Sequence, residues 1–263
     1  MIALVTGGAS GIGLAFAKKL ADLGYDLIIV GRTLDTLAAA QREIEEKYKV
    51  RVQIFIADIT KAEARERLYD YANNYDVSVV VNNAGIGLSK DFMDSSIEED
   101  IEVINLNIIA LQHIMKHYYK IFLEKKTGRI INISSLAGFV PGPGASTYYA
   151  SKAYVTSLTR AVFKEAKAHN VIIQAVCPGP TKSNFHAHAG TKAKAYRQDP
   201  HKLAIKALES KRVVVIVGFK NKLIHFFSKF LPQSWLAHFS YKTQKRIRIK
   251  WQVRNICYNN INH

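Results

Sequence analysis

The opening stretch of the chain, residues 1–13, constrains the fold more than any other. Residues 2–5 form a short apolar run typical of a buried strand, residues 6–13 are rich in glycine, and residues 14–23 follow a helical pattern. A strand, a glycine-rich turn and a helix in this order are typical of the first unit of a parallel sheet covered by helices. The glycines let the backbone approach a ligand closely, and the free N–H groups at the start of the helix favour a negatively charged group.

We therefore expect this turn to bind the pyrophosphate of a dinucleotide. An ordinary tight turn between a strand and a helix would also use glycine, so the motif alone decides little. Its place at the first strand, and the second strand that soon follows at residues 26–30, favour the dinucleotide. The candidate contacts at this turn are Gly7, Ser10, Gly11, Ile12 and Gly13.

The residues after the second strand indicate which dinucleotide is bound. Gly31 supplies no carboxylate that could accept a hydrogen bond from the ribose 2′-hydroxyl of NAD, and Arg32 supplies a guanidinium suited to a 2′-phosphate. NADP is therefore favoured over NAD. The competing interpretation is that Arg32 is an ordinary solvated charge, which is common for an arginine after a strand.

Length and cysteine content limit the class of protein. The 263 residues fit one large α/β domain with a parallel sheet under two helical layers. The two cysteines, Cys177 and Cys257, lie far apart without metal-ligand spacing, so we expect no disulfide framework and no metal site. No stretch approaches the roughly 18 consecutive apolar residues of a membrane span, and the first strand begins at Ile2, where a signal peptide would lie. These features predict a cytoplasmic protein.

Two further turns follow buried strands. The strand expected over residues 51–56 leads into a turn with Asp58, Ile59 and Thr60. Thr60 or Asp58 could cap the next helix, and Asp58 could equally reach the edge of an adenine ring. The strand at residues 77–81 leads into residues 82–85, whose sequence is Asn-Asn-Ala-Gly. This small polar turn either passes close to a ligand or is simply stabilised by asparagine side chains, and both interpretations stay open.

Tyr148 and Lys152 indicate the chemistry, because they stand four residues apart and share one face of a helix. Free tyrosine titrates near pH ~10, so a phenol that donates a proton near neutrality needs roughly 3 to 4 kcal/mol of help. A lysine about 4 Å away offers about 4 kcal/mol at an effective dielectric constant of ~20. Ser135, which ends the run at residues 129–135, could hold a substrate oxygen. The competing interpretation is an ordinary surface pair on a helix.

Together these motifs resemble the short-chain dehydrogenase/reductase family in its single-domain branch. The resemblance covers residues 1 to about 185 and implies a doubly wound parallel sheet of the Rossmann type, with about seven strands and helices on both faces. It also implies a homodimer or homotetramer, with the helices expected over residues 98–123 and 148–168 at the subunit contacts. The motifs that carry it are Thr6-Gly7-x3-Gly11-x-Gly13, the turn at Asp58, Asn82-Asn83-Ala84-Gly85, Asn105, Ser135, Tyr148-x3-Lys152 and Pro178-Gly179.

The resemblance implies roles for individual residues. Ser135 orients the substrate carbonyl, Tyr148 is the general acid or base, and Lys152 lowers the pKa of Tyr148 and binds the nicotinamide ribose. Asn105 holds a water molecule in a proton relay, with Asn107 on the same helix as its competitor. Cofactor contacts, besides the glycine turn, are implied for Arg32, Asp58, Ile59, Asn83, Ala84, Gly85, Tyr148, Lys152, Pro178, Gly179, Thr181 and Ser183.

Two segments indicate the substrate. Residues 138–144 are apolar and stiffened by proline, so we expect them to floor the pocket and to favour a hydrophobic carbonyl compound of lipid, steroid or ketoacyl type. A sugar or a small ketone stays open as the alternative. By the resemblance, residues 183–210 act as a substrate lid. His186 and His188 within this lid are not expected to bind a metal, because two histidines in a loop lack further ligands.

The C-terminal part carries most of the positive charge. The net charge is +16, and no acidic residue follows Glu209. We expect residues 1–218 to form the dinucleotide-binding and catalytic domain and residues 219–263 to form an amphipathic, basic extension of it. One side of the helix expected over residues 221–231 covers the core or a subunit interface, or docks on an anionic membrane surface. The apolar residues on that side are Leu223, Ile224, Phe226, Phe227, Phe230 and Leu231.

The sequence thus predicts an NADP-dependent oxidoreductase that interconverts a carbonyl and a secondary alcohol by hydride transfer, with Tyr148 handling the proton. The alternative is a cofactor-binding regulatory or scaffold protein of the same fold without turnover. The joint presence of Asn105, Ser135, Tyr148 and Lys152 argues against that alternative. Nucleic-acid binding is disfavoured, because the basic residues lie in one tail and no nucleic-acid-binding motif accompanies them.

Overall fold

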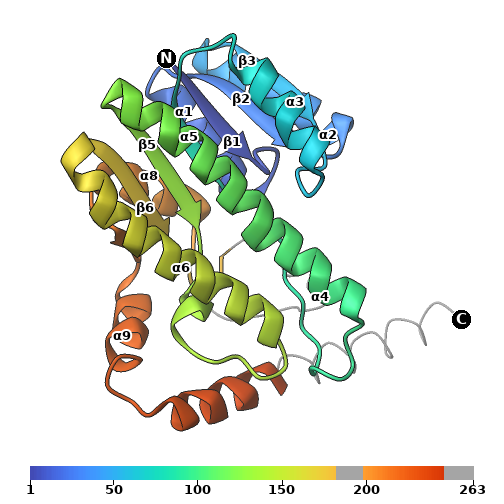
Figure 1. Cartoon of the computed structure of the whole chain (residues 1–263), viewed down its shortest axis with the longest axis vertical. Coiled ribbons are helices and arrows are strands. Elements are labelled where there is room, and N and C mark those ends of the chain that lie inside the picture. Colours follow the sequence, from blue (N-terminus) through green and yellow to red (C-terminus); the bar gives the residue numbers. More distant parts are fainter. Residues whose placement is uncertain (182–197, 246–263) are drawn as a thin grey trace, which may run out of the picture.

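One parallel sheet organises the molecule. The computed structural model describes residues 1–181 and 198–245, so Ser183, His186, His188 and much of the predicted lid lie outside the described residues. Within them, seven strands pair in the order β3-β2-β1-β4-β5-β6-β7, and every pair is parallel (Figure 1). The strands are β1 (Ile2–Thr6), β2 (Asp26–Gly31), β3 (Val52–Ile56), β4 (Val77–Asn82), β5 (Gly128–Ile133), β6 (Val171–Val176) and β7 (Val214–Val215). The predicted doubly wound sheet of the Rossmann type is confirmed.

Helices cover both faces of this sheet (Figure 1). One face carries α1 (Gly11–Asp22), α2 (Leu34–Tyr48) and α8 (Pro200–Glu209). The other face carries α3 (Ala62–Ala72), α5 (Leu111–Lys125) and α6 (Ser146–Ala166). The remaining helical elements are α4 (Ile97–Ile104), η1 (Asn105–Ala110), η2 (Leu136–Phe139), η3 (Lys167–His169) and α9 (Phe219–Phe227).

Two apolar cores follow from the alternation of side chains along each strand. In β1, Ala3 and Val5 join the core under α1, α2 and α8, while Ile2 and Leu4 join the core under α3, α5 and α6. All five residues of β1 are buried. Strands that are buried on both faces read as continuous apolar runs, which is why the sequence predicts them well.

The candidate site lies where the order of the strands reverses. The chain builds the sheet outward from β1 to β3 and then returns to place β4 on the other side of β1. The loops after β1 and β4 therefore leave the sheet in opposite directions, and open parallel sheets bind their ligands in the crevice between such loops. The glycine-rich turn follows β1, and residues 82–85 follow β4.

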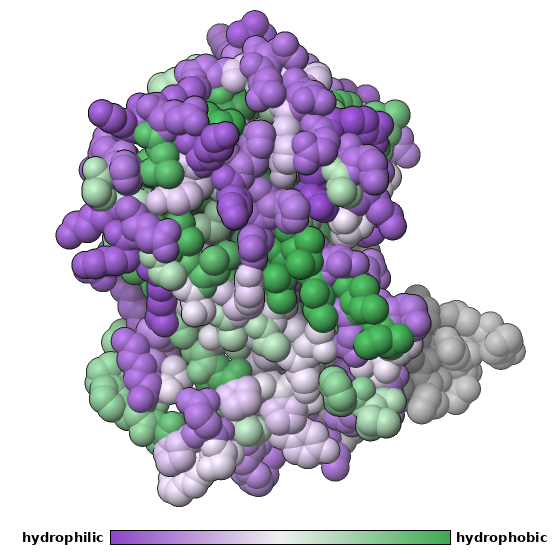
Figure 2. All heavy atoms as spheres, viewed as in Figure 1, coloured by the Kyte–Doolittle hydropathy of each residue, from purple (hydrophilic) through white to green (hydrophobic). Residues whose placement is uncertain are grey.

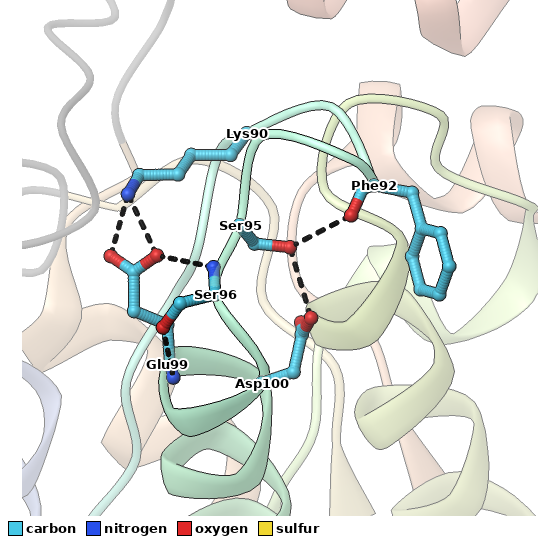
Figure 3. Close-up of polar contacts among 6 residues, drawn as sticks. All are labelled: Lys90, Phe92, Ser95, Ser96, Glu99 and Asp100. Carbon is cyan, nitrogen blue, oxygen red and sulfur yellow. Dashed lines mark hydrogen bonds and ion pairs between the residues drawn. The ribbon is translucent and has the colours of Figure 1, made fainter.

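The helical segment over residues 97–125 changes its hydrogen-bonding pattern in the middle. α4 starts with a capping box in which Ser96 Oγ accepts from the N–H of Glu99 at 3.3 Å and the Glu99 carboxylate accepts from the N–H of Ser96 at 3.0 Å (Figure 3). The π-helical turn η1 then joins α4 to α5. Turns of this kind inside helices are frequent at functional sites, and η1 contains both Asn105 and Asn107.

The C-terminal part begins after β7. Gly218, with a φ angle of 91°, precedes α9, and residues 233–245 are helical again. The helix expected over residues 221–231 starts earlier than predicted, at Phe219. It also ends earlier, because the chain turns directly after Phe227 and before Pro232 is reached. The division of the chain at residue 218 stays a prediction. Within the described ranges, no helix has the length and apolar character needed to cross a bilayer.

Candidate active site

The turn between β1 and α1 is shaped so that backbone, and not side chains, faces the crevice. Gly7 and Gly11 have φ angles of 63° and 54°, in the left-handed region that favours glycine. A Cβ atom on Gly13 would lie 2.1 Å from the carbonyl oxygen of Gly7. Ser10 is exposed immediately before α1, and Ile12 is partly buried against the core. This geometry fits a pyrophosphate at the start of α1.

Asn83 and Thr6 fix this turn to the end of β4. Asn83 Nδ2 donates to the carbonyl oxygens of Thr6 at 3.0 Å and of Gly7 at 3.1 Å. Thr6 Oγ1 accepts from the N–H groups of Asn83 at 3.0 Å and of Ala84 at 3.1 Å. Of the two interpretations of residues 82–85, the structure shows a turn that an asparagine side chain stabilises. The same bonds bring the backbone of Ala84 to the crevice.

Arg32 stands at the end of β2 with its side chain in solvent. Its Nη1 lies 4.0 Å from Glu102 Oε1, and both side chains are more than half exposed. An exposed ion pair of this kind contributes little to stability. The guanidinium is therefore accessible to a ligand, and the contact with a 2′-phosphate stays a prediction.

Asp58 and Ile59, after β3, have different surroundings. Burial alone would raise the pKa of Asp58, but hydrogen bonds from Thr60 and the charge of Arg32 hold that pKa below its usual value. Asp58 Oδ1 accepts from the hydroxyl of Thr60 at 2.7 Å and from its N–H at 3.1 Å, so it stabilises this turn. The prediction that Asp58 or Thr60 caps α3 is wrong, because the N-cap is Lys61 and no side chain of the described residues caps the helix. The side chain of Ile59 is buried in the core, and its carbonyl oxygen accepts from Arg65 Nη1 at 2.8 Å. Both groups therefore have partners within the protein, and the cofactor contact of Ile59 stays a prediction.

The end of β5 and the first turns of α6 bring the predicted catalytic side chains together. Lys152 is buried, and its Nζ donates to the carbonyl oxygen of Ile133 at 3.0 Å. The same nitrogen lies 5.8 Å from the centroid of the Tyr148 ring. Ser135 directly follows this part of the sheet and hydrogen-bonds to Tyr148. Ser135, Tyr148 and Lys152 therefore form one cluster in space.

The pKa of Tyr148 differs from the expectation. Burial raises the pKa of Tyr148 to about 12, and its hydrogen bond with Ser135 opposes this only in part. Burial also acts on Lys152 and lowers its pKa to about 8. The expected lowering of the Tyr148 pKa by Lys152 is not found. Removing the phenolate from water raises the pKa by more than the hydrogen bond with Ser135 lowers it.

Asn107, and not Asn105, faces this cluster. The fully buried Asn107 accepts from the N–H of Ile86 and donates to its carbonyl oxygen, each at 2.9 Å, and donates to Ser151 Oγ at 3.0 Å. A Cβ atom on Gly85 would lie 2.9 Å from Asn107 Oδ1 and 3.4 Å from Lys152 Nζ.

Asn105 is only partly buried, and its side chain has no hydrogen bond within the described part of the chain. Side chains two positions apart on a helix point in nearly opposite directions, about 200° apart in an α-helix. Only one of the two asparagines can therefore face α6. The structure therefore places Asn107, the stated competitor, beside the cluster and Asn105 away from it, while the role in a proton relay stays a prediction.

A buried polar chain that sequence reasoning missed joins the strands behind the site. Asn82 Nδ2 donates to Asn132 Oδ1 at 2.9 Å across β4 and β5, and Asn132 Nδ2 donates to Thr159 Oγ1 of α6 at 3.0 Å. Ser134 Oγ donates to the carbonyl oxygen of Lys152 at 2.9 Å. The available signal was an asparagine inside an otherwise apolar strand, which has to find a partner when buried.

Asp100 was also missed, and it holds the start of α6. Its carboxylate accepts from the hydroxyl of Thr147, the residue before Tyr148, and from Ser95 Oγ at 2.9 Å. Figure 3 shows Ser95 between Asp100 and the backbone of Phe92, beside the capping box of α4. A buried carboxylate in the first turn of α4 thus fixes both the loop after β4 and the helix that carries Tyr148.

The loop after β6 borders the other side of the cluster. Ser135 Oγ lies 3.5 Å from the carbonyl oxygen of Pro178, to which it donates. A Cβ atom on Gly179 would lie 2.5 Å from Asn221 Oδ1 of α9, so only glycine allows this close approach. Thr181 is buried and donates through Oγ1 to the carbonyl oxygen of Gly179 at 2.9 Å. The C-terminal part therefore packs directly on a predicted cofactor loop.

Comparison with known proteins agrees with this geometry. The model of the family described as short chain dehydrogenase matches residues 1–194. The hydroxysteroid dehydrogenase-like protein 1 of Gallus gallus is 32% identical over 179 residues, which cover 67% of this chain and 54% of that protein. The chain thus spans about half the length of this relative.

Two further proteins match over more of their length. The very-long-chain 3-oxoacyl-CoA reductase of Anas platyrhynchos is 30% identical over 265 residues, which cover 95% of this chain and 81% of that protein. The solved structure of a short-chain dehydrogenase from Sphingobium yanoikuyae in complex with NADPH superposes with a TM-score of 0.79 at 26% identity, covering 89% of this chain and 96% of that one. With the family model matched over most of the chain, the protein belongs to the short-chain dehydrogenase/reductase family.

Proposed function

We propose that the protein is an NADP-dependent oxidoreductase that interconverts a carbonyl and a secondary alcohol by hydride transfer. The observation that carries this proposal is the cluster of Ser135, Tyr148 and Lys152, which lies at the carboxyl edge of the sheet where the glycine turn also opens. A bound nicotinamide supplies or accepts the hydride. The side chains of the cluster supply the proton and the orientation of the substrate.

Tyr148 supplies the proton that the carbonyl oxygen takes up during reduction. With a pKa of about 12, this phenol is protonated near neutrality and ready to donate to a carbonyl oxygen that gains negative charge. Ser135 can turn its single hydroxyl proton from the Pro178 carbonyl oxygen to the same substrate oxygen, because its hydroxyl also lies beside Tyr148. Lys152 borders the cluster at Gly85 and, as an ammonium, can pass a proton toward Tyr148, while Asn107 holds the backbone of Ile86 and Ser151 Oγ beside it. This protonation state suits reduction of a carbonyl.

Arg32 supports NADP as the cofactor. Its guanidinium is exposed at the end of β2, and Gly31 leaves no carboxylate at the point where the ribose of a dinucleotide would lie. The related dehydrogenase of Sphingobium yanoikuyae was solved with NADPH, which adds support. The residues that would hold the cofactor are the glycine turn, Arg32, Asp58, Ala84 and Lys152.

The floor next to Ser135 supports a hydrophobic substrate. η2, with the sequence Leu-Ala-Gly-Phe, directly follows Ser135 and packs under the start of α6 and against α9. Related proteins are named for very-long-chain 3-oxoacyl-CoA, whose acyl chain is apolar, and for hydroxysteroids, which are largely apolar alcohols. We infer a lipid-like, steroid-like or ketoacyl carbonyl compound as the substrate class.

A substrate panel tests this function. Purified protein is mixed with NADPH and with long-chain ketoacyl, steroid, sugar and small-ketone carbonyl compounds, and the loss of NADPH absorbance is followed. We expect turnover with apolar carbonyl compounds and a loss of about 10²- to 10⁴-fold in Tyr148→Phe, which keeps the ring and removes the proton. NADPH binding without any turnover across the panel would instead indicate the cofactor-binding protein without catalysis.

A further inference from the structure

The C-terminal part presents an apolar surface to solvent, while three polar residues, Asn221, His225 and Ser228, face the protein. In α9, Asn221 is buried and Ser228, just after the helix, is buried too, while His225 between them packs against Phe139 of η2 in a tilted arrangement with ring centroids 4.1 Å apart. The exposed residues of this surface are Phe219 (80%), Leu223 (43%), Ile224 (55%), Phe226 (54%), Phe227 (49%) and Phe230 (70%). An amphipathic helix of a globular protein usually buries its apolar side, so this orientation is reversed.

Specific contacts hold α9 in this orientation. Asn221 Nδ2 donates to the carbonyl oxygen of Val217 at 2.8 Å and to Gln198 Oε1 at 3.3 Å. The pKa of His225 is lowered by burial and by nearby cations, so the ring that packs on Phe139 is neutral near pH 7. Asn221, His225 and Ser228 thus have partners within the protein, and the apolar side remains without a partner in the described chain.

The helix over residues 233–245 continues the same surface. Trp235 and Phe239 are 60% and 57% exposed and lie one turn apart, and Tyr241 is 40% exposed. Figure 2 shows pale green residues over α9 and near-white residues with some purple ones over residues 233–245, whereas the upper part is mostly purple. Trp and Tyr are the residues that favour the boundary between water and lipid.

The charges around this surface are of one sign. No acidic residue follows Glu209, and the described residues beyond it include seven exposed basic side chains, Lys211, Arg212, Lys220, Lys222, Lys229, Lys242 and Lys245. A symmetric contact between two copies would bring these same cations against one another, which disfavours a second copy as the occupant. Large exposed apolar residues with cations around them match an anionic lipid surface.

We propose that α9 and residues 233–245 form a docking surface for anionic membranes. The surface adjoins the candidate active site, because α9 packs on η2 and Gln244 Nε2 donates to the hydroxyl of Tyr149 at 2.9 Å, next to Tyr148. Figure 1 places α9 and the helix after it beyond the carboxyl ends of the strands, beside the start of α6. A protein docked in this way has its substrate side toward the bilayer.

Co-sedimentation with lipid vesicles tests this proposal without any use of enzyme activity. Full-length protein is mixed with phosphatidylcholine vesicles that contain or lack phosphatidylserine, at low and high salt. We expect pelleting with the phosphatidylserine vesicles, release at high salt, and little binding to phosphatidylcholine alone. Protein that stays in the supernatant with phosphatidylserine vesicles at low salt overturns the proposal, whatever its enzyme activity.

Two matched pairs of variants locate the surface. Phe226→Glu should lower vesicle binding at least about tenfold, while Leu23→Glu, at 52% exposure on the end of α1, should leave it unchanged. Lys222→Gln with Lys229→Gln should also weaken binding, and Lys164→Gln with Lys167→Gln should not. Circular dichroism and NADPH binding confirm that each variant is folded. If folded Phe226→Glu pellets with vesicles as the wild-type protein does, the surface does not bind lipid. If the substitution abolishes self-association and leaves pelleting unchanged, a second copy of the chain occupies the surface.

Discussion

Burial changes the acid–base properties of Tyr148 and Lys152 in opposite directions. It favours the neutral form of each group, so it raises the pKa of Tyr148 to about 12 and lowers the pKa of Lys152 to about 8. The phenol of Tyr148 therefore stays protonated at neutral pH. Keeping Lys152 charged in the buried site lowers the free energy of unfolding. Both properties belong to single residues in one small cluster.

Replacing Lys152 should make this cost measurable. Below pH 8 the lysine is charged in the folded and the unfolded chain; between about pH 8 and its ordinary value of 10.5, only the unfolded chain keeps the proton, so stability rises with pH. We expect Lys152→Met to raise the free energy of unfolding at pH 7 by about 1 to 3 kcal/mol while abolishing turnover. Urea denaturation should show this gain shrinking above pH 8, with exposed Lys164→Met as the unchanged control. A variant less stable than wild type at pH 7 contradicts the argument.

Substitutions of the two asparagines of η1 should have different effects on stability and turnover. Asn107→Ala leaves the N–H and the carbonyl oxygen of Ile86 without their partner, so we expect a loss of about 1 to 3 kcal/mol in stability together with at least about tenfold slower turnover. Asn105→Ala removes no hydrogen bond of the described chain and should leave both quantities near wild type. Steady-state kinetics and thermal denaturation measure the two effects. Reversed results would return the role to Asn105.

Arg32 can be tested by the choice of cofactor. Charge-assisted hydrogen bonds to a phosphate contribute roughly 1.5 to 3 kcal/mol, so Arg32→Ala should weaken NADPH binding about 10- to 100-fold and leave NADH binding nearly unchanged. Fluorescence titration with each cofactor gives the two affinities. Arg42→Ala, which removes an exposed arginine from α2, serves as the control. An equal loss for both cofactors would remove the contact with the 2′-phosphate.

Among the elements, those that depend on local pattern could be predicted from the sequence. Buried strands appear as apolar runs, and the glycine turn follows β1 where expected. The choice between Asn105 and Asn107 could not be made, because the π-helical turn η1 alters the direction of side chains and leaves no mark in the sequence. The pattern of α9 gives its two sides, but only the packing on η2 shows which side faces inward.

The turn between β1 and α1 gives the sharpest test at the level of an element. A Cβ atom on Gly13 would meet the Gly7 carbonyl oxygen at 2.1 Å, so Gly13→Ala has to displace the start of α1. We expect a loss of about 1 to 3 kcal/mol in stability and weaker NADPH binding. Gly24→Ala is the control, because its φ of 83° costs about 1 to 2 kcal/mol but nothing lies within 4 Å of the new atom. Unchanged NADPH affinity in folded Gly13→Ala would argue against a cofactor at this turn.

The whole molecule has a second exposed apolar surface, separate in sequence from α9. Ile97, Ile101, Ile104 and Ile109 are 66%, 45%, 38% and 39% exposed along α4 and η1. Figure 2 shows hydrophobic residues gathered over this helical segment. Unlike the C-terminal surface, this one has acidic as well as basic neighbours, with Glu99 paired to Lys90 and Glu102 near Arg32. Mixed charges allow two copies to meet without the repulsion expected at α9.

We therefore expect the protein to form a homodimer, the smaller of the assemblies that the family resemblance implies, through the isoleucines of α4. Ile101→Glu with Ile104→Glu would place two charges in such an interface and should convert the dimer to a monomer in sedimentation velocity. Ile56→Glu, at 50% exposure on the end of β3, should leave the dimer intact. Because α9 is not part of this interface, the monomeric variant should still bind anionic vesicles. A wild-type protein that sediments as a monomer, or a charged variant that remains dimeric, would move the subunit contact elsewhere.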